Sequence, residues 1–75
     1  MTSVHSTYGQ ELNSSMLKCA EYNPDLQELT ITFNNDEDYL FSEVEESVVR
    51  DFFSAESHGK YFNQNIKGKY NYSKI

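Results

Sequence analysis

The stretch LTITFNNDEDYLFSEVEESVVRDFF, residues 29–53, contains two hydrophobic periods in succession. In residues 29–33 apolar side chains alternate with threonines, which predicts a half-buried strand. Asn34-Asn35-Asp36 predicts a turn, because Asn and Asp side chains bond their own backbone. Tyr39-Leu40-Phe41 begins another short strand. The apolar residues that follow recur at the spacing of one helix face: Val44, Val48, Val49, Phe52 and Phe53.

The sequence on either side of this stretch completes the predicted fold. Residues 15–22 (SMLKCAEY) predict a first strand, and Asn23-Pro24-Asp25 predicts a turn after it. Ser42 and Glu45 have the spacing of a capping box, although the first helix can equally begin one or two residues later. A second helix follows, with Ser57 as its N-cap, Phe62 and Ile66 on its buried face and Gly68 as its terminator.

The fold class is therefore α+β, a small three-stranded antiparallel meander followed by two helices packed on the sheet. Residues 14–70 form the domain, and residues 71–75 form a C-terminal tail. Residues 1–13 are polar and lack periodicity, and we interpret them as a flexible arm. An alternative stays open, in which Val4 and Tyr8 dock this arm on a neighbouring subunit.

Length and composition narrow the class of protein. Seventy-five residues make one domain with a modest core, and such small domains often self-associate. Cys19 is the single cysteine, which excludes an internal disulfide and suits a reducing compartment. The polar N-terminus predicts no signal peptide, and the chain has no apolar run near the ~20 residues that a membrane span needs. We expect a cytoplasmic homo-oligomer, a dimer or tetramer.

The charges are segregated along the chain. Residues 1–56 hold all twelve acids against Lys18 and Arg50, a net charge of −10, whereas residues 57–75 hold four lysines and no acid, a net charge of +4. The basic segment also carries Tyr61, Phe62, Tyr70 and Tyr72. A large nucleic acid would meet repulsion from the acidic remainder, but a small anion in one pocket would meet much less.

Several spaced positions resemble the KTSC domain, which is named for its place at the C-terminus of some lysyl-tRNA synthetases. The resemblance covers residues 14–70, and its most specific part is Ala55-x-Ser57-x-Gly59-x-Tyr61-Phe62-Asn63-x-x-Ile66-x-Gly68-x-Tyr70. The chain departs from the usual family pattern at Glu21, Asp36, Phe41 and Glu45. The synthetase context implies RNA binding. In size and composition the chain also resembles, more loosely, the phage-encoded sponge proteins that sequester cyclic nucleotide immune signals, which would place it in the host cytoplasm.

The basic segment contains the parts of a nucleotide site. Lys60, Asn63, Gln64 and Lys67 have the spacing of one helix face, opposite Phe62 and Ile66. Lysines would hold phosphates, aromatic rings would stack on bases, and the helix start offers backbone N–H groups. The predicted ligand-binding residues are Ser57, Gly59, Lys60, Tyr61, Asn63, Lys67, Lys69, Tyr70 and Tyr39. The alternative is a structural helix with a solvated lysine face.

Other chemistries have little support in the sequence. Asp36-Glu37-Asp38 lacks the alternating ligands and the glycine of a calcium loop, and His5, His58 and Cys19 lack zinc spacing. No nucleophile has a base at a suggestive position, so we expect neither an enzyme nor a cofactor. Ser14 and Ser15 are expected to bond their own turn rather than a phosphate.

Three functions follow from these observations. The first is capture of a small phosphorylated ligand, most sharply a phage-type oligomeric sponge for a cyclic dinucleotide. The second is an RNA-binding module. The third is a protein–protein adaptor that uses the aromatic C-terminus, Tyr70, Tyr72 and Ile75.

Overall fold

The computed structural model describes residues 8–12 and 14–75. Within these ranges, four strands of four or more residues and one three-residue strand form a single antiparallel sheet in the order β1-β2-β3-β4-β5. The elements are β1 (Tyr8–Glu11), β2 (Leu17–Asn23), β3 (Glu28–Phe33), β4 (Asp38–Phe41), α1 (Glu46–Ser54), α2 (His58–Tyr61), the π-helix η1 (Phe62–Ile66) and β5 (Tyr72–Lys74). No described helix combines the length and the apolar character that crossing a membrane requires.

The three predicted strands are confirmed as β2, β3 and β4, but the predicted strand count is wrong because two edge strands flank them. The expectation of a flexible arm does not hold for residues 8–11, which pair with β2, whereas residues 1–7 and 13 lie outside the described residues. A Cβ at Gly9 would lie 2.5 Å from the Ala20 carbonyl oxygen, so the missing side chain lets β1 approach β2. Backbone pairing of this kind leaves no hydrophobic period to detect in the sequence.

The expected C-terminal tail is the second edge strand, β5. It pairs with β4, matching Phe41 to Tyr72 and Tyr39 to Lys74. Two further backbone bonds extend the pairing, since the N–H of Ser42 donates to Asn71 O and the N–H of Ile75 donates to Asp38 O, both at 2.9 Å. The free edge of β4 therefore orders a segment whose own sequence is polar and short.

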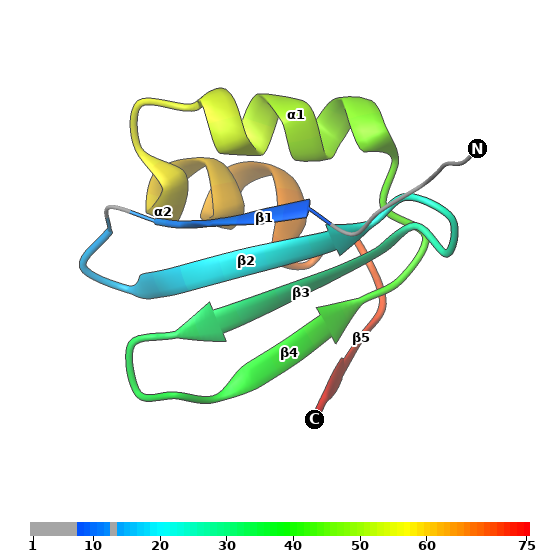
Figure 1. Ribbon diagram of the computed structural model, residues 1–75. Helices are drawn as coiled ribbons and strands as arrows, with labels where there is room; N and C mark the ends of the chain where they lie inside the picture. The colour runs from blue at the N-terminus through cyan, green and yellow to red at the C-terminus, as the bar shows by residue number, and fades with distance from the viewer. Residues whose placement is uncertain (1–7, 13) are drawn as a thin grey trace.

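The helices cover one face of the sheet (Figure 1), as the sequence predicts. Leu29 and Ile31 of β3 are completely buried, and the intervening threonines lie on the other face. From the helices, Val49, Phe52, Phe62 and Ile66 complete the core. The apolar face of β3 and the apolar stripe of α1 thus pack together in one hydrophobic layer. Burial of apolar surface in such a layer is the main favourable contribution to the free energy of folding.

The helix ends agree with the sequence in one case and not in the other. The Ser42–Glu45 capping box is wrong: Glu45 is the N-cap of α1 and makes no side-chain cap bond. Glu43 has a φ of 58°, and this left-handed residue takes Ser42 out of line with the helix.

Ser57 is confirmed as the cap of α2, because its Oγ accepts from the N–H of Lys60 at 3.3 Å. Gly68, at a φ of 79°, follows the last helical turn, where other residues would be strained.

The two predicted turns are present and use the expected chemistry. Asn23 Oδ1 accepts from the N–H of Asp25 at 3.0 Å, and Asn35 Oδ1 accepts from the N–H of Glu37 at 3.2 Å. Asp36 has a φ of 67°, a conformation that Asp tolerates better than most residues. Asp36 is one of the positions that depart from the usual pattern of the family that the sequence resembles, and the turn is kept there.

Tyr22 joins the sheet to the segment before α1. Its ring is fully buried, and its hydroxyl donates to Val44 O at 2.6 Å. Replacing Tyr22 by Phe leaves a buried carbonyl without this donor, and we expect the free energy of unfolding to fall by about 1–3 kcal/mol. Urea denaturation measures this change. Tyr72→Phe is the matched control, since Tyr72 is 58% exposed, and should change stability by less than about 0.5 kcal/mol. Equal effects of the two substitutions would contradict the role given to the Tyr22 hydroxyl.

Candidate ligand-binding site

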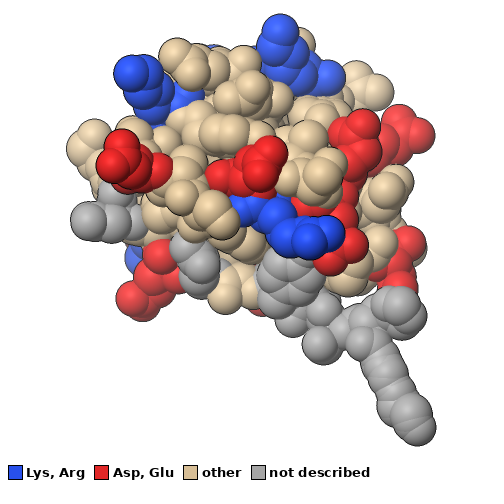
Figure 2. Space-filling view, turned by 90° about the horizontal axis from the view of Figure 1, so that it is seen from above, with Lys and Arg blue, Asp and Glu red and all other residues tan. Residues whose placement is uncertain are grey.

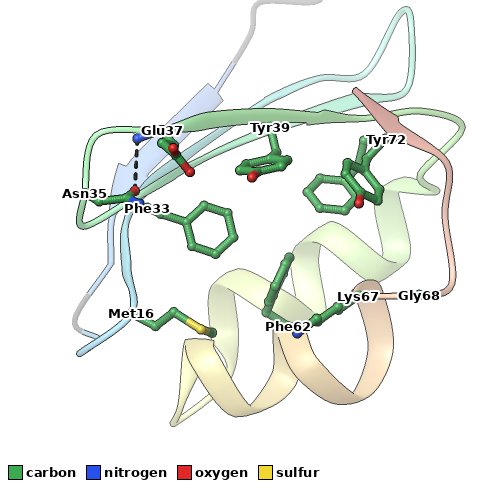
Figure 3. Close-up of a pocket in the computed structure, with 10 residues that line it drawn as sticks. Met16, Phe33, Asn35, Glu37, Tyr39, Phe62, Lys67, Gly68 and Tyr72 are labelled. Carbon is green, nitrogen blue, oxygen red and sulfur yellow. Dashed lines mark hydrogen bonds between the residues drawn. The ribbon is translucent and has the colours of Figure 1, made fainter. Parts of the chain in front are cut away.

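A hollow of about 280 Å³ opens between the helix-facing side of the sheet and η1 (Figure 3). We call it the aromatic hollow, because five of its lining residues are aromatic: Phe33, Tyr39, Phe41, Phe62 and Tyr72. The other lining residues are Met16, Asn35, Glu37, Lys67 and Gly68. Its volume is just below the range of about 300–1,000 Å³ that small-molecule sites occupy.

The five aromatic rings form a closed cycle of contacts. Tyr39 and Phe62 each lie beside Phe33, with centroids 5.3 and 5.6 Å away. Phe41 and Tyr72 close the cycle, with centroid distances of 5.6 Å from Tyr39 to Tyr72, Tyr72 to Phe41 and Phe41 to Phe62. The contacts of Phe33 and of Phe62 are edge-to-face, a favoured geometry of aromatic pairs. The rings therefore hold one another in place without a ligand.

The register of the sheet places these aromatic residues together. Ile31 pairs with Tyr39, Leu29 with Phe41, and Phe41 with Tyr72. Directly paired residues share a face of the sheet, so the two tyrosines lie on the same face as the buried Leu29 and Ile31. Tyr39 and Tyr72 are only partly covered, which leaves ring surface available to a ligand.

Two lysines and one acid set the charge of the aromatic hollow. Lys74 Nζ donates to the Glu37 carboxylate at 2.9 Å, and this bond holds the pKa of Glu37 below its usual value. Lys67 is the lysine that lines the hollow; it is exposed and forms no ion pair with any residue in the described ranges. With Glu37 compensated by Lys74, Lys67 leaves the rim with an excess positive charge.

A second hollow, of about 510 Å³, is lined mainly by polar groups, and we call it the polar hollow. Its lining residues are Ser14, Ser15, Met16, Ser57, Gly59, Lys60, Asn63 and Gln64. Ser14 Oγ accepts from the N–H groups of Met16 and Leu17, at 3.1 and 3.2 Å, which confirms the turn chemistry expected of Ser14. A Cβ at Gly59 would lie 3.0 Å from Ser14 Oγ, so Gly59 lets the helix pack against this turn.

The predicted helix face is divided between the two hollows. Lys60, Asn63 and Gln64 line the polar hollow, whereas Lys67 lines the aromatic hollow. The reason is the π-helical turn, in which the N–H of Lys67 donates to Phe62 O, five residues earlier, at 2.8 Å. A wider turn shifts every following residue around the axis, so α-helical spacing misplaces Lys67.

The remaining predicted residues lie elsewhere. Tyr61 packs toward α1, where its hydroxyl donates to Val48 O at 3.4 Å and burial raises its pKa. Tyr70 donates to Glu45 Oε1 at 2.7 Å. Lys69 is exposed and lines neither hollow. The site predicted around Lys67 and Tyr39 therefore includes neither Tyr61, Tyr70 nor Lys69.

The charge segregation of the sequence is partly cancelled in space. Glu37, from the acidic part of the chain, forms an ion pair with Lys74 of the basic segment, and Glu45 accepts a hydrogen bond from the uncharged Tyr70 hydroxyl. Figure 2, the view onto the α1 side, shows basic groups interspersed with acidic ones and no single basic patch. An extended anionic partner would therefore meet both signs of charge on this face.

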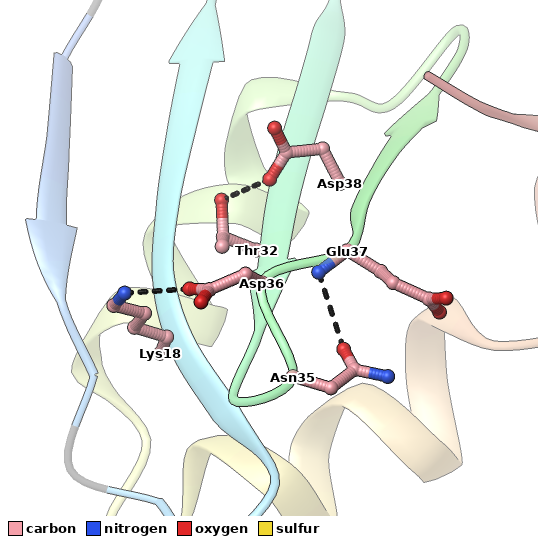
Figure 4. Close-up of polar contacts among 6 residues, drawn as sticks. All are labelled: Lys18, Thr32, Asn35, Asp36, Glu37 and Asp38. Atoms are coloured by element: carbon pink, nitrogen blue, oxygen red, sulfur yellow. Dashed lines mark hydrogen bonds and ion pairs between the residues drawn. The ribbon is translucent and has the colours of Figure 1, made fainter.

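The acidic turn between β3 and β4 directs its carboxylates toward different partners (Figure 4). Asp36 binds Lys18 Nζ at 2.7 Å, and Asp38 accepts from Thr32 Oγ1 at 2.6 Å. Glu37 binds Lys74. Among the residues that the structure describes, no three His, Cys, Asp or Glu side chains gather at metal-binding distance.

Sequence reasoning missed most of the walls of the aromatic hollow. Phe33 and Phe41 were predicted as strand residues and not as part of the site, yet both line the hollow. Strand alternation places them on the same face as Tyr39, which was the available signal. Tyr72 gave no such signal, because its strand forms only against the edge of β4.

The sequence model of the KTSC domain matches residues 13–70. The chain belongs to the KTSC domain family. The crystal structure of a KTSC domain protein from Yersinia pestis superposes with a TM-score of 0.87 at 34% identity, covering 93% of this chain and 99% of that one. The match confirms the resemblance that the spaced residues between Ser14 and Tyr70 suggested.

Relatives of this KTSC domain occur in two contexts. The lysine–tRNA ligases of Nostoc punctiforme and another Nostoc species are 36% and 33% identical to it over 61 residues, or 81% of this chain. The chain spans only 11% of the length of either ligase. A protein of Tsukamurella paurometabola is 34% identical over 61 residues, which make up 91% of that protein. The domain therefore occurs both within a large enzyme and as nearly a whole chain.

The Tyr70–Glu45 bond of this KTSC domain predicts a pH dependence. Burial, with a smaller contribution from Glu45, raises the pKa of Tyr70 from 10.0 to about 12. Tyrosinate absorbance of the wild type minus that of Tyr70→Phe should show a midpoint near pH 12. A raised pKa means that this stabilisation is complete below pH 10 and is lost as the pH rises through about 12.

Glu45→Gln removes the carboxylate and keeps the burial. The Tyr70 midpoint should then fall part of the way toward 10, because burial is the larger cause. Circular dichroism at each pH checks that the protein is folded. A wild-type midpoint near 10 in folded protein would contradict the partly buried, hydrogen-bonded position of Tyr70.

Proposed function

We propose that this KTSC domain is a non-catalytic binding protein that captures a small phosphorylated ligand carrying a flat ring, such as a nucleotide. The observation that supports this most is the closed cycle of five aromatic rings around a hollow with Lys67 at its rim. Base–aromatic stacking tolerates any base, because every base has a π-face. A lysine at the rim supplies a point charge for the phosphate.

The charge of the rim favours an anion over a cation. Aromatic cages also bind quaternary ammonium groups, which would gain from Glu37. However, Glu37 is already compensated by Lys74, and Lys67 would repel a second cation. We therefore assign the hollow to a ring that is linked to a phosphate.

The side chains nearby support binding rather than turnover. Ser57 Oγ and Ser14 Oγ each accept backbone N–H groups, and His58 is buried against Phe52. Among the described residues, no hydrogen bond joins either serine hydroxyl to a His, Asp or Glu side chain. The sharpest form of the proposal is a phage-type sponge for cyclic nucleotide signals, which holds free signal low by stoichiometric binding. The dimer or tetramer expected for such a sponge stays a prediction, to be checked by sedimentation equilibrium.

Thermal unfolding with a panel of ligands tests this proposal. The panel contains mono-, di- and trinucleotides in cyclic form, ADP-ribose, and tetramethylammonium as the cationic control. A ligand that binds only the folded protein adds roughly 2.7 kcal/mol at a hundredfold excess over its dissociation constant. We expect an increase in Tm with at least one nucleotide and none with tetramethylammonium.

Lys67→Glu and Lys69→Glu make the same charge change two residues apart, and only Lys67 lines the hollow. Lys67→Glu should abolish the nucleotide-induced shift and leave the Tm of the free protein nearly unchanged, because the side chain is exposed. Lys69→Glu should retain most of the shift. If the two variants bind a nucleotide equally well, the aromatic hollow is not its site. A shift with tetramethylammonium that grows in Lys67→Glu would reassign the hollow to a cation.

The lysine–tRNA ligase relatives favour a second candidate, an RNA-binding module. The net charge of −6 opposes a long polyanion, so any such binding should be weak and strongly dependent on salt. Fluorescence anisotropy with a labelled single-stranded RNA at several salt concentrations separates the candidates. Affinity for RNA that falls steeply with salt, with no mononucleotide binding, would favour the module over the capture protein.

A further inference from the structure

The two hollows adjoin at one side chain. Met16 lines both, and its Cε lies 3.7 Å from the position that a Cβ on Gly59 would occupy. Methionine is unbranched and adapts its conformation easily. The partition between the hollows is therefore a flexible thioether, and Gly59 presents no side chain beside it.

The polar hollow has the chemistry that the aromatic hollow lacks. Lys60 and the amides of Asn63 and Gln64 face it, and all three residues are exposed. Its lining contains no acid, and Lys60 forms no ion pair with the rest of the described chain. Amide groups both donate and accept hydrogen bonds, as ribose hydroxyls and base edges require, and the ammonium group suits a phosphate.

The two hollows together offer more space than the aromatic hollow alone. The aromatic hollow alone, at about 280 Å³, accommodates one ring system, while the polar hollow adds about 510 Å³ on the other side of Met16. Lys67 lines the aromatic hollow and Lys60 lines the polar hollow, and the π-helical turn lies between them in the chain. A ligand that uses both must have a flat ring at one end and a sugar-phosphate unit at the other.

We infer that the two hollows are one bipartite site for a dinucleoside phosphate unit. One base occupies the aromatic hollow, and the linking phosphate and second sugar occupy the polar hollow beside Lys60 and Asn63. This inference rests on the proposed function, which requires only the aromatic hollow. The unit can belong to a free dinucleotide, cyclic or linear, or to a single-stranded RNA.

Isothermal titration calorimetry of the full chain tests the inference with AMP, cyclic di-AMP, linear pApA and an adenine hexanucleotide. The double variant Lys60→Gln/Asn63→Ala removes the polar contacts. Lys69→Gln/Asn65→Ala is its matched control, since those two exposed residues line neither hollow. One charged hydrogen bond gained by the second unit corresponds to roughly tenfold in affinity.

We expect a ligand with two nucleotide units to bind the wild type and the control at least roughly tenfold tighter than AMP. The Lys60→Gln/Asn63→Ala variant should lose this gain and bind AMP as the wild type does. If AMP binds in a Lys67-dependent manner and none of the longer ligands binds more tightly than AMP, the bipartite site is refuted and the proposed function stands. A gain that persists in Lys60→Gln/Asn63→Ala also refutes it. If none of the ligands binds, both proposals fail.

The longer ligands identify the source of the unit. Equal affinity for a dinucleotide and the hexanucleotide supports a site for the free dinucleotide. Tighter binding of the hexanucleotide that is also lost in Lys60→Gln/Asn63→Ala supports the same site occupied by an RNA strand.

Discussion

The packing of Phe62 between β3 and β4 is the contact on which the rest of the structure depends. Its ring lies edge-to-face against Phe33 and Phe41 and is 2% exposed, so it belongs to the core and to the aromatic hollow at once. Its carbonyl accepts the N–H of Lys67 and closes the π-helical turn. One residue thus joins the helix to the sheet, shapes the hollow and sets the direction of the lysine after it. π-helical turns of this kind are rare in proteins, and those that occur are often found at functional sites.

A domain of 75 residues has a small hydrophobic core, and here only one face of the sheet is covered by helices and contributes to that core. Phe41 and Phe62 are buried in that core, and the other three rings of the hollow, Phe33, Tyr39 and Tyr72, extend it toward solvent. Because they contact one another, they are held in place by the same interactions that stabilise the fold. A preorganised hollow of this kind loses little conformational entropy when a ligand enters it.

Charge is arranged differently in the chain and in space. The strongly acidic first part folds so that Glu37 forms an ion pair with Lys74 of the basic segment, and Glu45 accepts a hydrogen bond from the uncharged Tyr70 hydroxyl. Lys60 and Lys67 have no such partner among the described residues, and these are the two lysines that line hollows. The net charge of the protein therefore says less about its ligand than these two side chains do.

The sequence by itself determined the local structure. Alternation in residues 29–33, the helical stripe that ends at Phe53, the Ser57 cap and the Gly68 terminator are each set by neighbouring residues, so they can be identified without the fold. The sequence also indicated the family, through the residues at fixed spacing between Ser14 and Tyr70. Only the tertiary structure decided the edge strands, since β1 and β5 form by pairing with an existing sheet edge and have no pattern of their own. The tertiary structure likewise separated Lys60 from Lys67, because the turn between them is π-helical, and a π-helical turn does not keep the α-helical spacing on which the sequence prediction relied.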